Sequence, residues 1–205
     1  MIMGSFITFP LMMLMAVIAE PIVILLLTEK WILCVPFVQL ACIKYAFSPI
    51  HSANLQAVKA IGRSDIFLKL SLVKNSITIL LLIVSVPFGI YAVAISGVIG
   101  SLLHLLINIV PNIKLIDYSL REQLADIIPN AVLTLLTGGV AISIKLFNLD
   151  IYPTMLIQIA AVFSLYFIIA KLLNMRALNE SKKLLSNISI LMSNNKAGHT
   201  SVIVK

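Results

Sequence analysis

The chain has 205 residues, of which 60% are hydrophobic and only 11% are charged. Soluble domains usually carry about 25% charged residues, so this composition argues against a water-soluble globular domain. The formal net charge of +7 does not indicate nucleic-acid binding, because the cations lie between long apolar runs, where they orient helices and contact anionic lipid headgroups.

Apolar runs of about 18 residues or more, the length of a transmembrane helix, recur along the chain. They predict an all-α fold, a polytopic membrane bundle of about six transmembrane helices within residues 1–174. The predicted spans are residues 5–27, 32–60, 66–86, 90–110, 127–147 and 154–173. Beyond them we expect a cytoplasmic amphipathic helix over 175–193 and a disordered tail over 194–205.

Short polar segments separate the predicted spans. Trp31 closes the first turn as an interfacial anchor. A structural turn follows the second span, where Gly62 permits a tight backbone, Arg63 adds a charge, and Ser64 or Asp65 can cap the next helix. Residues 112–126 mix charges with leucines at helical spacing, which predicts a segment that lies along the membrane interface.

The cations are distributed unequally between the two sets of loops. One set and the tail hold most of them, whereas the other set holds Lys30 and Lys145 beside Glu29 and Asp150. The cations of the richer set are Lys59, Arg63, Lys69, Lys74, Lys114 and Arg121. The positive-inside rule therefore predicts that both termini are cytoplasmic.

Signatures of enzymes and of bound metals are missing from the sequence. Cys34 and Cys42 do not have the spacing of a metal or redox motif, and the three histidines are far apart. Glu20 is the one acid well inside a predicted span, which argues against metal-dependent phosphotransfer. We expect a protein without enzymatic activity, metal or cofactor.

Glu20 and Lys44 are ionisable residues at bilayer depth, where an unpaired charge costs about 3 kcal/mol. Two interpretations stay open. The two residues form an ion pair between the first two spans, or Lys44 faces an aqueous cavity and meets an anionic substrate. A third possibility is that the pair merely stabilises a kink at Pro21.

Other polar residues also fall on helix faces within the predicted spans. His51, Asn54 and Lys59 lie near one stripe and suggest the cytoplasmic mouth of a pathway, although snorkelling to the headgroups explains Lys59 equally well. His104 and Asn108 are four residues apart, and this spacing favours interhelical hydrogen bonds. Gly138 and Gly139 predict close helix packing or a flexible point.

The order and spacing of several short elements resemble a known family. They lie in residues 6–31, 35–77 and 85–101, and the match is good over about 5–130. The elements are Ala19-Glu20-Pro21, Glu29-Lys30-Trp31, Pro49-Ile50-His51 and Gly62-Arg63-Ser64-Asp65. This region resembles the second half of bacterial polysaccharide repeat-unit flippases, which belong to the multidrug/oligosaccharidyl-lipid/polysaccharide exporter superfamily.

The resemblance implies one lobe of a two-lobe exporter in the bacterial cytoplasmic membrane. The implied substrate is an undecaprenyl-pyrophosphate-linked oligosaccharide, whose pyrophosphate would meet cations that line a cavity. The implied partners are membrane lipid and an N-terminal lobe or a second copy of the chain, because six spans supply half of such a transporter. Lys44 replaces an expected small or apolar residue, so it takes no role from the family.

Two other functions are compatible with the sequence. One is a cation-coupled multidrug exporter of the same superfamily. The other is a membrane scaffold of a glycan-synthesis complex, which would transport nothing. The uncharged start of the chain, which lacks the cations that usually orient a first span, predicts a fragment, a truncated product or one subunit of a split transporter.

Overall fold

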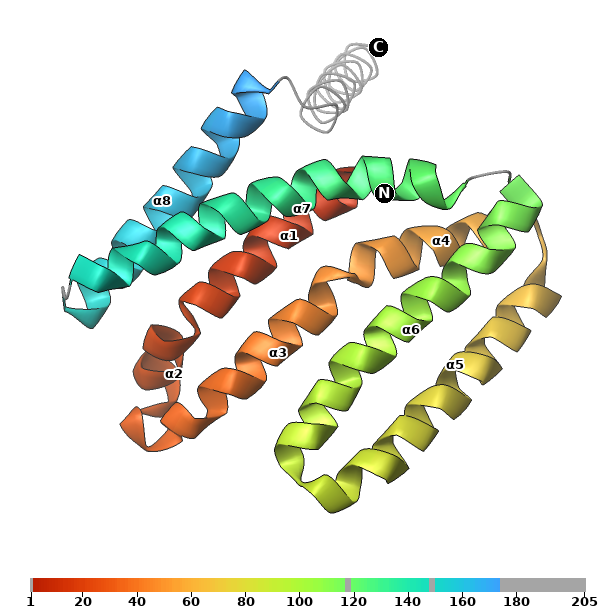
Figure 1. Cartoon of the computed structure of the whole chain (residues 1–205), viewed down its shortest axis with the longest axis horizontal. Helices are drawn as coiled ribbons and strands as arrows, with labels where there is room; N and C mark the ends of the chain where they lie inside the picture. The colour runs from red at the N-terminus through yellow and green to blue at the C-terminus, as the bar shows by residue number, and fades with distance from the viewer. Residues whose placement is uncertain (1, 117–118, 148–149, 174–205) are drawn as a thin grey trace, which may run out of the picture.

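The computed structural model describes residues 2–116, 119–147 and 150–173, and within them it contains helices and no strand (Figure 1). The elements are α1 (Ile2–Val17), α2 (Ala19–Leu27), η1 (Glu29–Cys34), α3 (Val35–Ala46), α4 (Ser48–Ala60), α5 (Ser64–Ser85), η2 (Val86–Phe88), α6 (Ile90–Ile116), α7 (Leu120–Ser143), η3 (Ile144–Phe147) and α8 (Ile151–Leu172). The predicted all-α class is confirmed.

Five helical stretches of the described residues are long and apolar enough to cross a membrane. The number becomes six if α1 and α2, which are bent by 64° relative to each other, form one span. The prediction of a multi-pass membrane protein with about six spans is therefore confirmed. The predicted helix over 175–193 and the tail over 194–205 lie outside the described residues.

Two of the predicted spans are interrupted, each close to a proline. The first breaks at Ile18, three residues before Pro21, and the second breaks at Phe47, two residues before Pro49. Proline has no backbone N–H and therefore removes one hydrogen bond of the helical ladder. Beyond the second break the ladder resumes as the backbone N–H of His51 donates to the Phe47 carbonyl at 3.2 Å.

The predicted interfacial segment over 112–126 is wrong as a separate element among the described residues. α6 continues to Ile116, and α7 begins at Leu120. A capping box starts α7: the Glu122 backbone N–H donates to the Ser119 hydroxyl at 3.3 Å, and the Ser119 backbone N–H donates to the Glu122 carboxylate at 2.9 Å. The polar residues of this region therefore belong to the end of α6 and the start of α7. Their helical spacing is the same in two long helices as in one interfacial helix, so the spacing alone could not distinguish the two arrangements.

The helices form two groups that meet where α1 packs against α3 (Figure 1). In the first group α1 packs against α7 and α8, and the Tyr166 hydroxyl donates to the Phe6 carbonyl at 2.9 Å. In the second group α6 packs against α3, α4 and α5. Gly138 permits close approach within the first group, because a Cβ there would collide with the Met13 side chain.

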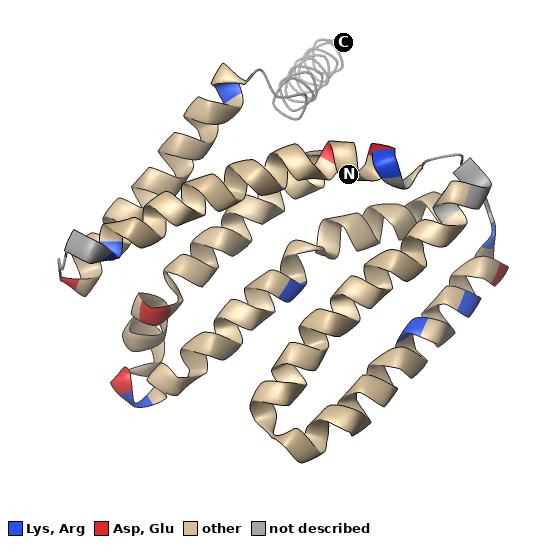
Figure 2. Ribbon diagram, viewed as in Figure 1, with Lys and Arg blue, Asp and Glu red and all other residues tan. Residues whose placement is uncertain are grey.

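Charged residues lie mainly at the ends of the bundle. Figure 2 shows cations at the start of α5 and at the start of α7, which lie at one end of the molecule. At the same end, the Asn54 side chain of α4 donates a hydrogen bond to the Gln123 side chain of α7 at 3.4 Å and so links these two helices. α5 lies at one edge of the molecule and buries only Ser85, so its apolar surface is available to lipid (Figure 1).

Candidate functional site

A chain of polar side chains crosses the second helix group. The Lys74 ammonium of α5 donates to Asn108 Oδ1 of α6 at 3.0 Å. Asn108 Nδ2 lies 3.4 Å from His51 Nδ1 of α4, and His51 Nε2 lies 3.3 Å from Ser101 Oγ of α6. The Ser101 hydroxyl then donates to the Lys44 carbonyl of α3 at 3.1 Å. These contacts join four helices that are separate in sequence.

A second set of contacts lies beside this chain. The His104 Nε2 atom of α6 lies 3.2 Å from the Lys74 carbonyl and 3.1 Å from the Thr78 hydroxyl. The rings of His51 and His104 meet edge to face, with centroids 6.5 Å apart. The predicted interhelical hydrogen bonding of His104 and Asn108 is therefore confirmed.

A cavity of about 350 Å³ lies against these residues, between α3, α4, α5 and α6. Its polar lining residues are Lys44, Tyr45, Ser48, His51, Thr78, Ser96, Ser101 and His104. Among the described residues no Asp or Glu lines it. The cavity thus joins one ammonium and two imidazoles, with a second ammonium on Lys74 nearby, and no carboxylate balances them.

Lys44 extends toward α6. A Cβ added at Gly97 would lie 3.8 Å from the Lys44 ammonium, so the bare backbone there leaves room for this side chain. The ammonium also lies 5.5 Å from the centre of the Tyr45 ring, within the range of a cation–π contact. Of the two interpretations of Lys44, the cavity-facing position is the one observed.

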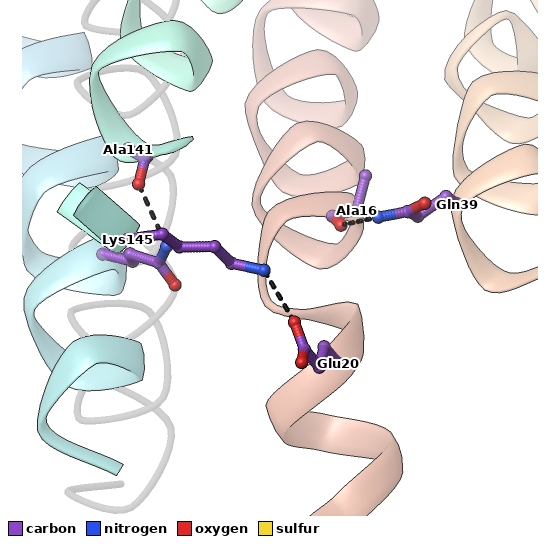
Figure 3. A network of polar contacts seen from close by, with 6 residues as sticks. Ala16, Glu20, Gln39, Ala141 and Lys145 are labelled. Carbon is purple, nitrogen blue, oxygen red and sulfur yellow. Dashed lines mark hydrogen bonds and ion pairs between the residues drawn. The ribbon is translucent and has the colours of Figure 1, made fainter. Parts of the chain in front are cut away.

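The predicted ion pair between Glu20 and Lys44 is wrong. Glu20 pairs instead with Lys145 of η3 at 2.9 Å (Figure 3). Close by, the Gln39 side chain donates to the Ala16 carbonyl at 3.2 Å, next to the break between α1 and α2. Because the break turns α2 away from the axis of α1, Glu20 meets the segment after α7 rather than the lysine of α3.

The other candidate residues do not join the cavity. Asn54 is 1% exposed and bonds Gln123, so it holds α4 against α7. Lys59 lies over the Phe67 ring at 4.6 Å, near the end of α4, where snorkelling is an adequate explanation. The predicted stripe of His51, Asn54 and Lys59 therefore separates into three environments.

The predicted structural turn between α4 and α5 has the expected backbone. Gly62 has a positive φ of 75°, a conformation that favours glycine. Arg63 forms an exposed ion pair with Asp65 at 3.0 Å, which links the turn to the first residues of α5. No side-chain cap is formed at the start of α5, so the predicted capping role of Ser64 or Asp65 is not observed.

Lys74 and Thr78 were not predicted as site residues. The sequence pattern placed Lys74 among the loop cations, but it lies ten residues into α5, about 15 Å from the start of that helix. This distance can be read from the sequence. It indicates a site residue, because a cation so far inside a membrane helix needs a partner. No group of three or more His, Cys, Asp or Glu side chains that could hold a metal occurs in the described part of the chain.

The chain was compared with protein-family models, curated proteins and solved structures, and no match was found.

Proposed function

We propose that the chain is one lobe of an exporter that moves undecaprenyl-pyrophosphate-linked oligosaccharide repeat units across the bacterial cytoplasmic membrane. The observation that carries the proposal is the cavity between α3 and α6, where Lys44, His51 and His104 have no acidic neighbour among the described lining residues. Inside a bilayer an unbalanced cation is costly, and an anionic ligand offsets that cost. The pyrophosphate of a lipid-linked sugar is such a ligand.

The resemblance to polysaccharide flippases adds support through the positions of its matched elements. Ala19-Glu20-Pro21 lies at the break between α1 and α2, and Pro49-Ile50-His51 begins α4. Glu29-Lys30-Trp31 lies in η1, and Gly62-Arg63-Ser64-Asp65 joins α4 to α5. The resemblance therefore rests on the interruptions and turns that shape the first two spans, rather than on apolar sequence that any membrane helix could share.

The orientation and the partners belong to the same proposal. Both termini are cytoplasmic, and the end of the bundle that holds the starts of α5 and α7 faces the cytoplasm (Figure 2). One lobe provides one wall of an alternating-access pathway, so the lobe works with an N-terminal lobe or with a second copy.

The two alternative functions, a multidrug exporter and a scaffold, differ from the proposed one in the ligand that the cavity would hold. Drugs carried by a cation-coupled exporter are commonly cationic, and the ammonium of Lys44 would repel them from this cavity. A scaffold of a glycan-synthesis complex requires no ligand in the cavity. Dye efflux driven by an ion gradient, with no effect on polysaccharide, would favour the drug exporter.

Complementation of a strain that lacks its polysaccharide flippase tests the proposal. The full chain is expressed alone and together with the N-terminal lobe of a flippase, and surface polysaccharide is measured. We expect export only with the partner lobe, loss of export with Lys44→Glu, and retention with Lys44→Arg. Lys30→Glu, in η1 and outside the cavity lining, is the matched control and should export normally.

Two outcomes contradict the proposal. Normal export by Lys44→Glu would separate the cavity from transport and favour the scaffold. Export by the chain alone, at a protein concentration where it is monomeric, would contradict the half-transporter arrangement.

A further inference from the structure

The hydrogen-bonded chain at His51 has a single consistent direction. A lysine ammonium can only donate, so the atom of Asn108 that faces Lys74 at 3.0 Å must be the amide oxygen. The Asn108 amide nitrogen is then the atom that lies 3.4 Å from His51 Nδ1, and it donates to that atom. Nδ1 of His51 is therefore an acceptor and carries no proton.

The other side of His51 follows from the same reasoning. With Nδ1 unprotonated, the neutral ring carries its proton on Nε2 and donates to Ser101 Oγ at 3.3 Å. The Ser101 hydroxyl is free to donate to the Lys44 carbonyl at 3.1 Å. Each donor in the chain from Lys74 to Lys44 thus meets an acceptor, and His51 holds one proton.

A second proton on His51 is incompatible with this arrangement. It would place an N–H on Nδ1 opposite the N–H of the Asn108 amide, so two donors would face each other. Rotation of the amide by half a turn supplies its oxygen to His51, but it then directs the amide nitrogen at Lys74. Protonation of His51 and the hydrogen bond from Lys74 to Asn108 therefore exclude each other.

We propose that His51 is a proton-binding site that is linked to oxyanion binding in the cavity, an inference that rests on the proposed function of that cavity. Protonation places an imidazolium on the cavity wall and releases the Lys74 ammonium from its acceptor. An oxyanion such as the pyrophosphate of the substrate then meets the His51 imidazolium and the released Lys74 ammonium in addition to Lys44. By linkage, oxyanion binding favours proton uptake by the same factor.

A protonated His51 needs a negative charge nearby, and its surroundings indicate that this charge is supplied by a bound anion. The ionisable groups that face it are Lys74 from α5, His104 from α6, and Lys44 with Tyr45 from α3. α1, which also packs against α4, carries no ionisable side chain. None of the described residues that line the cavity is a carboxylate, and Glu122 and Asp126 of α7, which meets α4 at Asn54, are outside that lining. Within the cavity, the charge that balances an imidazolium therefore arrives with the ligand.

His104 provides a matched control in the same cavity. Its Nε2 faces the Lys74 carbonyl, which can only accept, so Nε2 carries the proton. No hydrogen bond between His104 Nδ1 and the described residues is observed, and a second proton there breaks none of the bonds described above. Loss of His104 should therefore leave the linkage in place.

The test measures anion affinity at two pH values, using the full chain in nanodiscs of zwitterionic phosphatidylcholine, which exclude anionic headgroups as competitors. Sulfate is the probe because its charge is constant in this range, whereas a phosphate group titrates near about pH 6. Binding is measured by calorimetry at about pH 5.5 and about pH 7.5, on either side of the ordinary histidine pKa of about 6.5.

We expect sulfate to bind about tenfold more tightly at the lower pH, which corresponds by linkage to uptake of about half a proton per anion averaged over the two pH units. His51→Gln should lose most of the tenfold difference, whereas His104→Gln should keep most of it, because the bonds that His51 protonation rearranges do not include His104. If His51→Gln fails to fold by thermal unfolding and gel filtration, Asn108→Leu replaces it. That variant removes the amide between His51 and Lys74, so the difference should fall below about threefold.

The outcomes separate this inference from the proposed function. Sulfate binding with the same affinity at both pH values overturns the proton linkage and leaves the anion cavity intact. A tenfold pH dependence that survives in His51→Gln or in Asn108→Leu, or that disappears in His104→Gln, also overturns it. Absence of binding at either pH overturns the anion cavity and the linkage together.

Discussion

Glu20 and Lys145 form an ion pair of 2.9 Å across 125 positions of the sequence. Glu20 lies in the first turn of α2, just past the break in the first span, and Lys145 lies in η3, just past the end of α7. The pair (Figure 3) therefore joins the bent part of the first span to the hairpin between α7 and α8, at the end of the bundle away from the starts of α5 and α7 (Figure 1).

Neutralising one partner of this pair should change stability only slightly. Both side chains are almost half exposed, at 41% and 44%, and screened pairs of this kind contribute about 0.2–1 kcal/mol. We expect Lys145→Gln to lower the free energy of unfolding by less than about 1 kcal/mol. Exchange of the two residues (Glu20→Lys with Lys145→Glu) should restore the loss, as measured by a double-mutant cycle of thermal unfolding. A loss of several kcal/mol would show that the pair is shielded from solvent.

Gly138 and Gly139 are adjacent but should respond differently to substitution. A Cβ at position 138 would collide with Met13 of α1, whereas a Cβ at position 139 would meet no atom within 4 Å. We expect Gly138→Val to destabilise the fold by about 1–3 kcal/mol, as overpacked cores do. Gly139→Val is the control and should have a much smaller effect in the same unfolding assay. Equal effects would contradict the close packing of α1 and α7.

The capping box at Ser119 should determine how stably α7 begins. Ser119→Ala removes the acceptor for the Glu122 backbone N–H, and loss of such a cap costs about 0.5–2 kcal/mol. Glu122→Gln keeps a side chain that can accept from the Ser119 backbone N–H, so it should cost less. Hydrogen exchange of the first turn of α7 is the direct measurement. Unchanged protection in Ser119→Ala would contradict the cap.

Gly97 should control the position of Lys44. An alanine at this position would make ordinary van der Waals contact with the Lys44 side chain, at 3.7 Å, and should be tolerated. Gly97→Leu fills the space between α3 and α6 and displaces the ammonium. If Lys44 contributes a charge-assisted hydrogen bond to the anion, Gly97→Leu should weaken sulfate binding by about tenfold or more. Equal affinities in Gly97→Ala and Gly97→Leu would contradict this role.

The pairing partner of Glu20 could not be predicted from its depth along the helix. Glu20 and Lys44 are at similar calculated depths, which suggested a pair, but the 64° bend at Ile18 directs Glu20 elsewhere. Pro21 indicated a kink in the sequence, but a proline alone does not give the direction of the bend. That direction depends on the packing of α2 against α3 and α8, which only the folded chain supplies.

The polar cluster shows the same division between local and tertiary information. The spacing of His104 and Asn108 predicted that both lie on one face and bond to another helix, and both do so. The spacing could not identify Lys74 and Thr78 as partners, because two residues on different helices meet only through the crossing and register of those helices.

Composition and apolar run length determined by themselves that the chain is an all-α membrane bundle of about six spans, because a bilayer leaves a long apolar chain few structures other than helices. Turn chemistry determined the tight backbone at Gly62 in the same way. The tertiary structure alone decided that Lys44, His51 and His104 line one cavity, with Lys74 beside it, while Glu20 lies apart from it. Hydrophobicity specifies which segments enter the membrane, but helix packing decides which polar side chains share a site there.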